Sequence, residues 1–234
     1  MPRTNQLYPE MKNALLPVLV ITLMLGSCSG ETTDRDRAIL SGKVKSVTEH
    51  QFEATLEDGR WVAGDPSFIG HRIMKYDRDG NYLETVALNQ QGDTTGYSVV
   101  ERRDGKIVEE EFYSVHMRRT TRTILEWVSE TQANFEIWEG DVLHYEGANF
   151  YDNRGRILRQ VRMVNMKEVT NHYIYKKNLL VENYHQDMDG NRTFTQVYGY
   201  QDFDRKDNWT IRLIYAGDEK VIPDLIVTRE IEYY

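Results

Sequence analysis

Residues 76–84 read Tyr76-Asp77-Arg78-Asp79-Gly80-Asn81-Tyr82-Leu83-Glu84, and this segment decides the fold class. Asp77 can cap a turn with its own carboxylate, and Gly80 or Asn81 can adopt the left-handed backbone conformation of a short loop. Runs rich in aromatic and β-branched residues flank such signals, as is typical of strands. The segment therefore predicts a β-hairpin with a loop of about three to five residues.

The same pattern of turn residues recurs along the chain. A close copy occupies residues 151–156, and looser copies occupy residues 103–109, 187–191 and 203–209. Between these signals the side chains alternate as in strands, for example Leu225, Val227, Arg229, Ile231 and Tyr233. These runs predict an all-β antiparallel meander of about a dozen short strands joined by hairpins. Because twisted sheets of more than about ten strands curl or split, we expect a curved or barrel-like sheet.

Composition agrees with a globular chain and argues against nucleic acid as a partner. The 234 residues are 40% hydrophobic and 28% charged, with 15 tyrosines against 7 phenylalanines and 4 tryptophans. The formal net charge is −8 for the whole chain, and it is about −9 without residues 1–28, which hold Arg3, Glu10 and Lys12. A domain with a negative net charge repels the phosphate backbones of nucleic acids. The chain has one basic stretch, which comprises Arg102, Arg103, His116, Arg118, Arg119 and Arg122. We interpret this stretch as a solvated strand face in preference to a patch for a sulfated or phosphorylated glycan.

The N-terminus carries an export signal. After Lys12, residues 14–25 are uncharged and mostly apolar, which is too short for a membrane-spanning helix but typical of a secretory signal peptide. Met11 is a plausible true start, because Met11-Lys12 opens a signal of ordinary length. The tetrad Leu25-Gly26-Ser27-Cys28 resembles the lipobox of bacterial lipoproteins. That resemblance implies cleavage before Cys28 and attachment of acyl chains to it.

The lipobox has consequences for the remaining chain. Cys28 is the only cysteine, so the mature protein has no internal disulfide, thiol catalyst or thiolate metal site. Several acyl chains hold a protein firmly to a bilayer. We therefore predict a signal peptide over 1–28, a polar tether over 29–40 and a β domain over 41–234. The predicted location is the cell envelope, lipid-anchored at the outer membrane on its periplasmic or surface face.

The Tyr-Asp-x-x-Gly-x-x-Leu pattern resembles the YD repeats of Rhs-type proteins. Together with residues 41–49, 207–210 and 228–234, it makes the chain similar to a group of uncharacterised Bacteroidetes lipoproteins. The resemblance covers most of residues 41–234 and implies a fold and a location, but no activity. The repeats are degenerate, since residues 204–208 lack a glycine and residues 116–141 lack the pattern.

Motifs for catalysis or metal binding are weak. Two aspartate-rich turns, at residues 77–81 and 187–191, imitate the first ligands of a calcium loop, but lack its glycine at position six and glutamate at position twelve. Turn capping is the favoured interpretation. The six histidines show no metal-ligand spacing. Glu109 and Glu111 would share one face of a strand and could supply a glycosidase carboxylate, although a solvated edge is favoured. We therefore predict neither a metal, a cofactor nor an enzymatic activity.

Aromatic residues offer the remaining candidate site. Tryptophans and tyrosines could form a platform on which sugar rings stack, although most of them suit cross-strand pairs in a sheet core better. Trp127 and Trp138 are the ligand-binding candidates, because they lie outside the clear repeats. The partners would be the membrane, through lipid on Cys28, and a glycan or an envelope protein.

Three functions remain open at this point. The favoured one is a non-catalytic binding or scaffold lipoprotein. The first alternative is a carrier of lipid or lipoprotein with an apolar cavity, and the second is an envelope hydrolase. The carrier needs consistently apolar inward faces, whereas the strand faces here mix apolar residues with Thr, Gln and Arg.

Overall fold

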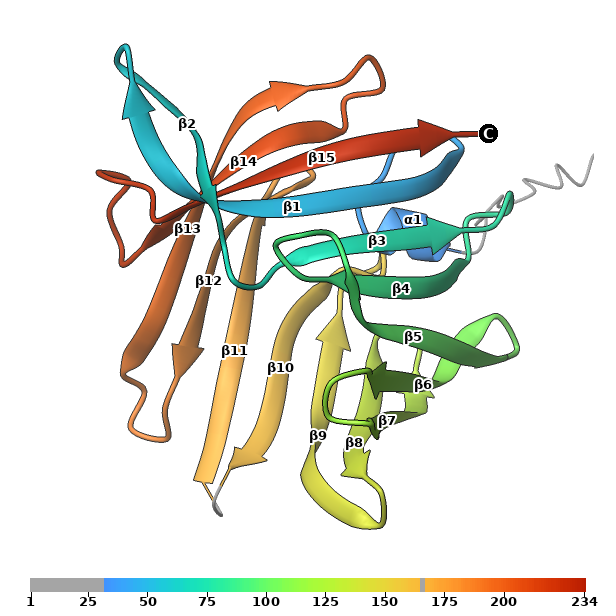
Figure 1. The fold of residues 1–234 in the computed structure, drawn as a ribbon. Coiled ribbons are helices and arrows are strands. Elements are labelled where there is room, and N and C mark those ends of the chain that lie inside the picture. Colours follow the sequence, from blue (N-terminus) through green and yellow to red (C-terminus); the bar gives the residue numbers. More distant parts are fainter. Residues whose placement is uncertain (1–31, 165–166) are drawn as a thin grey trace, which may run out of the picture. The chain divides into compact units, whose positions relative to one another are not determined.

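The computed structural model describes residues 32–164 and 167–234, which are almost entirely β-strand (Figure 1). A short helix, α1 (Asp34–Arg37), precedes fifteen strands. They are β1 (Val44–Glu57), β2 (Arg60–Pro66), β3 (His71–Tyr76), β4 (Tyr82–Leu88), β5 (Thr94–Arg103), β6 (Lys106–Ser114), β7 (Arg119–Ser129), β8 (Gln132–Glu139), β9 (Val142–Tyr151), β10 (Ile157–Val164), β11 (Lys167–Lys176), β12 (Leu179–Gln186), β13 (Arg192–Phe203), β14 (Trp209–Ala216) and β15 (Leu225–Tyr233). The predicted all-β meander is confirmed, with more and longer strands than expected.

The strands close into a barrel. From β3 to β15 each strand pairs antiparallel with the next, and β1 joins the two ends by pairing with both β3 and β15. Glu49 of β1 lies opposite Arg72 on one side and Arg229 on the other. β2 pairs only with the second half of β1, so it lies outside the ring that the other strands form.

A meander places successive turns at opposite ends of a barrel. One end holds the start of β1, the end of β15 and the turns that follow β3, β5, β7, β9, β11 and β13; it is hereafter named the terminal end. The other, the far end, holds the β1–β2 and β2–β3 connections and the turns that follow β4, β6, β8, β10, β12 and β14.

The turns use the chemistry that the sequence predicts. Asp77 Oδ1 accepts hydrogen bonds from the backbone N–H of Gly80 and of Asn81, each at 2.8 Å, and Gly80 has a φ of +97°. Asp152 and Asp187 accept equivalent bonds in their turns. In the turn that lacks a glycine, Asp207 takes the left-handed conformation instead, with a φ of 63°.

The two faces of the sheet carry separate apolar clusters. The inner face is identified by Val47 and Tyr76, which pack against Leu40 from the segment before β1. A second inner cluster comprises Tyr198, Trp209, Ile214 and Val227. Leu213, Tyr215 and Ile226 form a cluster on the outer face, where Trp61 of β2 packs against them. The strand that lies outside the ring therefore covers apolar surface that would otherwise meet water.

Candidate functional site

Residues 32–40, which the sequence predicts as part of a polar tether, are packed against the barrel. A capping box starts α1: Thr33 Oγ1 accepts from the Asp36 N–H at 3.3 Å, and Asp36 Oδ2 accepts from the Thr33 N–H at 2.9 Å. Leu40 is only 6% exposed and contacts the inner cluster around Val47. The segment has too few apolar residues for a periodic pattern, so its packing left no signal in the sequence.

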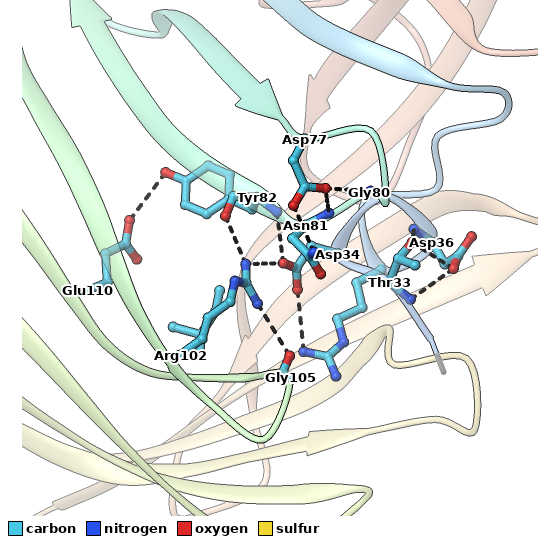
Figure 2. Close-up of polar contacts among 12 residues, drawn as sticks. Thr33, Asp34, Asp36, Asp77, Gly80, Asn81, Tyr82, Arg102, Gly105 and Glu110 are labelled. Atoms are coloured by element: carbon cyan, nitrogen blue, oxygen red, sulfur yellow. Dashed lines mark hydrogen bonds and ion pairs between the residues drawn. The ribbon is translucent and has the colours of Figure 1, made fainter. Parts of the chain in front are cut away.

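Helix α1 is bound to one side of the terminal end (Figure 2). The Asp34 carboxylate accepts a hydrogen bond from the Tyr82 N–H at 2.9 Å and forms an ion pair with Arg102. The Arg35 N–H donates to the Gly80 carbonyl at 3.0 Å. These bonds join the helix to the β3–β4 turn and to β5.

The same segment reaches other sides of the ring. The Arg37 guanidinium lies 5.2 Å from the centre of the Trp127 ring on β7, and its side chain lies against Gly155 in the β9–β10 turn. Ser41 exchanges two bonds with Asn208 in the β13–β14 turn, of 2.7 and 2.9 Å. The segment therefore contacts turns on several sides of the ring and lies across the terminal end. Residues 32–43 are hereafter named the cap.

A charge cluster around the buried Glu49 lies on the inner face beside the closing strand. Both oxygens of Glu49 are used: Oε2 pairs with Arg72 at 2.7 Å, and Oε1 pairs with Arg229 at 2.7 Å. Burial would raise the pKa of Glu49, but Arg229, Arg72 and Arg212 outweigh it and lower that pKa to about 2. Glu49, Arg72, Arg212 and Arg229 are hereafter named the arginine cluster.

Polar side chains continue along the inner face. Gln160 Nε2 donates to Asn149 Oδ1 at 2.9 Å, and Asn171 Nδ2 donates to Gln160 Oε1 at 3.4 Å. Tyr173 on β11 and Tyr198 on β13 lie on the same face, and burial raises the pKa of both hydroxyls. The inner face of β9–β13 thus combines amides with tyrosines.

The predicted ligand-binding tryptophans lie on opposite faces of the sheet. Trp127 faces inward, where it stacks on Tyr151 at 5.2 Å and donates from Nε1 to the Ile107 carbonyl at 2.9 Å. Trp138 pairs in register with Arg122 on the outer face and donates from Nε1 to Glu136 Oε2. The two rings therefore cannot share one platform. Cys28, the predicted lipid attachment site, lies outside the described residues.

The other sequence candidates also divide between the faces. Glu109 and Glu111 face outward, and Glu109 pairs with Arg122 at 3.8 Å. Glu110 faces inward and accepts from the Tyr82 hydroxyl at 3.5 Å. Because Arg102 points inward to Asp34 while Arg122 points outward, the basic stretch forms no single patch. Across 32–164 and 167–234, no group of three or more His, Cys, Asp or Glu side chains could hold a metal ion.

A pocket of about 480 Å³ lies at the terminal end, lined by Asp204, Arg205, Lys206, Thr210, Ile231 and Tyr233. The Tyr233 hydroxyl donates to Asp204 and accepts from Asn208 Nδ2. Burial and the neighbouring Asp204 raise the pKa of Tyr233 to about 12. Two of the lining side chains, those of Asp204 and Tyr233, are thus already engaged in fixing the β13–β14 turn.

Sequence reasoning missed the arginine cluster. Its members lie up to 180 positions apart, and barrel closure alone brings them together. One signal was present: Arg229 is the charged residue in an otherwise apolar alternating run, Leu225, Val227, Arg229, Ile231 and Tyr233. A charge on the buried face of a strand requires a partner, which makes such a residue a candidate for a site.

No protein-family model matches the chain, and no curated protein matches it. Among solved structures, a porin-like protein from Bacteroides vulgatus ATCC 8482 has a TM-score of 0.46 and 12% sequence identity, covering 82% of this chain and 98% of that one. A porin-like protein from Bacteroides uniformis ATCC 8492 has a TM-score of 0.34 and 7% identity, with the same coverage. Likenesses this weak carry no conclusion about function.

Proposed function

We propose that this protein is a lipid-anchored, non-catalytic binding protein of the cell envelope, which takes its ligand at the inner face of the barrel. The observation that carries the proposal is the cap. Residues that follow closely on the lipobox cross the terminal end and are bound to several sides of the ring. The anchored end of the barrel is thus the occupied end, and a ligand would enter from the far end.

The distance between lipid and cap supports this orientation. Thr32 lies four positions after Cys28, and four extended residues span at most about 14 Å. A lipid on Cys28 would therefore keep the terminal end close to the membrane. The far end would face away from the bilayer, where a ligand in the aqueous phase can reach it.

Charges on the outer face favour water around the barrel over lipid. Ion pairs join neighbouring strands on that face, including Lys75 with Glu84 at 2.6 Å and Glu109 with Arg122. Charged side chains facing the middle of a bilayer cost about 2–4 kcal/mol for each Arg or Lys. In the described part of the chain, no helix is long and apolar enough to span a membrane. Attachment through an acylated cysteine fits these strands better than insertion does.

The titratable groups support a non-catalytic role. Carboxyl groups with lowered pKa values include Asp77, Asp152 and Asp187, and each lies in a turn where it accepts backbone N–H groups. These are structural uses, since hydrogen bonds within each turn, including that from the Arg156 side chain to Asp152, account for the direction of the shifts. Glu49 is held between arginines on both sides, so it is placed to stabilise the barrel and not to exchange protons.

The inner face also favours a polar ligand over a lipid. An apolar cavity for acyl chains would require apolar inward side chains, yet Asn149, Gln160 and Asn171 form a bonded row there. Burying such groups beside an acyl chain costs free energy wherever a hydrogen bond is lost. The carrier alternative therefore has weaker support than a binding protein for a glycan or an envelope protein.

The anchor is tested by changing Cys28 to Ala and partitioning cell extracts with a detergent that separates into two phases. We expect the wild-type protein in the detergent phase and the variant in the aqueous phase. The matched control is Ser29→Ala, which changes the neighbouring residue and should behave as wild type. Equal partitioning of Cys28→Ala and wild type would contradict the lipid anchor.

Binding is tested with the protein purified from membranes in mild detergent and immobilised. Envelope extracts, fractionated into glycans and proteins, are passed over it, and retained material is identified by mass spectrometry. We expect a specific retained species that free protein displaces. Turnover of glycosidase, esterase, phosphatase or peptidase substrates, abolished by substitution of a single His or Glu, would overturn the non-catalytic assignment.

A further inference from the structure

We propose that the arginine cluster binds the anionic group of the ligand, a carboxylate, sulfate or phosphate, through Arg212 and Arg229. This inference rests on the proposed binding function and names the chemistry of the ligand. It assigns the site to the inner face of β14 and β15, next to the strand that closes the barrel.

The first support is the balance of charge. Three guanidinium groups surround one carboxylate, and both oxygens of Glu49 are taken by Arg72 and Arg229 at 2.7 Å. Among the described residues, Arg212 has no acidic side chain within ion-pairing distance. The cluster therefore carries an excess of positive charge, in which Arg229 is nearly buried while Arg72 is about half exposed. Such an excess is unfavourable unless an anion compensates it.

The second support is a set of donors without acceptors. Arg229 is only 9% exposed, and its Nη1 makes no hydrogen bond within the described chain. The Nε of Arg212 is also buried and without a partner there. Buried donors are nearly always satisfied in folded proteins, by protein, by water or by a ligand. An oxyanion offers several acceptor atoms to both groups at once.

The third support is the rigid frame around these donors. The Arg229 guanidinium lies 3.5 Å from the centre of the Trp209 ring, and that of Arg212 lies 4.5 Å from it. Arg212 also lies 5.2 Å from the centre of the Tyr198 ring. Stacking against rings fixes the guanidinium planes and leaves their N–H edges free for hydrogen bonding. The same rings could stack on the body of a ligand such as an acidic sugar.

A purely structural role explains only part of the cluster. Glu49 and Arg229 face each other across the junction of β1 and β15, and Arg72 extends the pair to β3, so these three stabilise closure. Arg212 lowers the pKa of Glu49 through its charge but makes no ion pair with it, so it takes no part in the direct contacts that close the ring. Its Nε, which has no partner among the described residues, and its position against Trp209 are the features that a ligand would account for.

Calorimetry on the detergent-purified protein tests the proposal. The probes are glucuronate, inorganic phosphate, inorganic sulfate and, as a neutral control, glucose. We expect saturable binding of at least one oxyanion and a raised Tm in its presence; glucuronate alone would indicate an acidic glycan, and phosphate or sulfate a free ion. Arg212→Gln should weaken binding at least about tenfold, and Arg212→Lys should weaken it less.

The matched control is Arg159→Gln. Arg159 also stacks on an aromatic ring, 4.1 Å from the centre of Phe150, but on the outer face. It should bind the oxyanion as wild type does. Failure of every oxyanion to bind, or equal binding by Arg212→Gln and wild type, would overturn the anionic site. Retention of a neutral glycan or a protein, unaffected by Arg212→Gln, would also overturn it while leaving the binding function intact.

Discussion

The two ends of the barrel use the same turn chemistry for different purposes. At the terminal end, Asp77 caps its turn and Gly80 offers its carbonyl to the cap. At the far end, Asp187 caps an equivalent turn, with Asn191 N–H at 2.8 Å from its Oδ1, but an added Cβ at Gly190 would meet only Gln186. The Asp-x-x-Gly-Asn pattern thus predicts the turn but does not predict which residues pack against it.

The surroundings of the two ends differ in the same way. Leu40 of the cap is 6% exposed at the terminal end, whereas Phe68 and Phe194 at the far end are 85% and 80% exposed. Substitutions at the terminal end should therefore change the stability of the barrel, and equivalent ones at the far end should not.

The largest difference in the free energy of unfolding is expected between substitutions at two carboxyl groups with lowered pKa values, one buried and one exposed. Glu49→Gln leaves buried arginines without a carboxylate and should cost about 3–5 kcal/mol of unfolding free energy at neutral pH. The folded pKa of Glu49, about 2, lies below its ordinary value of 4.5. Its contribution is therefore present above pH 4.5 and is lost as the pH falls towards 2. Urea unfolding across this range should show that the wild-type protein loses free energy of unfolding as the pH falls, and that the loss is smaller in the variant.

The matched control for Glu49→Gln is Asp187→Asn at the far end. Hydrogen bonds from the Asn191 side chain and backbone lower the pKa of Asp187, but this carboxyl is exposed to solvent. Its substitution should shift the urea midpoint much less than Glu49→Gln. Similar shifts in both variants would mean that the buried cluster does not set the acid sensitivity.

An intermediate effect is expected for the apolar contacts of the cap. Leu40→Ala removes a buried side chain and should cost about 2–4 kcal/mol. Phe68→Ala at the far end should stay within about 0.5 kcal/mol. Limited proteolysis should also cut within residues 32–43 faster in Leu40→Ala than in wild type. If the two variants unfold at the same urea concentration, the cap does not contribute to barrel stability.

The smallest effect is expected from a pair of turn glycines. Gly155 and Gly190 both have positive φ values, of +73° and +83°, so alanine at either position is strained by about 1–2 kcal/mol. A Cβ at Gly155 would also lie 2.7 Å from Arg37 Cγ in the cap. Gly155→Ala should therefore be less stable than Gly190→Ala by about another 1 kcal/mol. Thermal unfolding of the two variants measures this difference, and identical Tm values would argue against the cap contact.

Local features of the fold were predictable, whereas distant contacts were not. The segments around Asp77, Asp152 and Asp204 carry turn residues between alternating runs, so their hairpins follow from the sequence. The pairing of β1 with β15 depends on a register between residues about 180 positions apart, which no local pattern encodes. The cap was misjudged because its contacts are made by arginines, an aspartate and Leu40, which in sequence are typical of a linker. Trp127 and Trp138 illustrate the same limit, since strand parity and register decide which face each ring occupies.

The pairing of β1 with β15 also has a consequence for how the chain folds. Every other junction of the ring joins strands that are close in sequence, either as a local hairpin or, for β1 and β3, with only β2 between them, and can form soon after synthesis. This junction needs the last strand, so the barrel remains an open sheet with two free edges until the C-terminus has arrived. Free edges invite pairing with other chains. Truncation before Leu225 should therefore produce aggregation and not a smaller stable barrel, and the interval before closure is when chaperones would matter most.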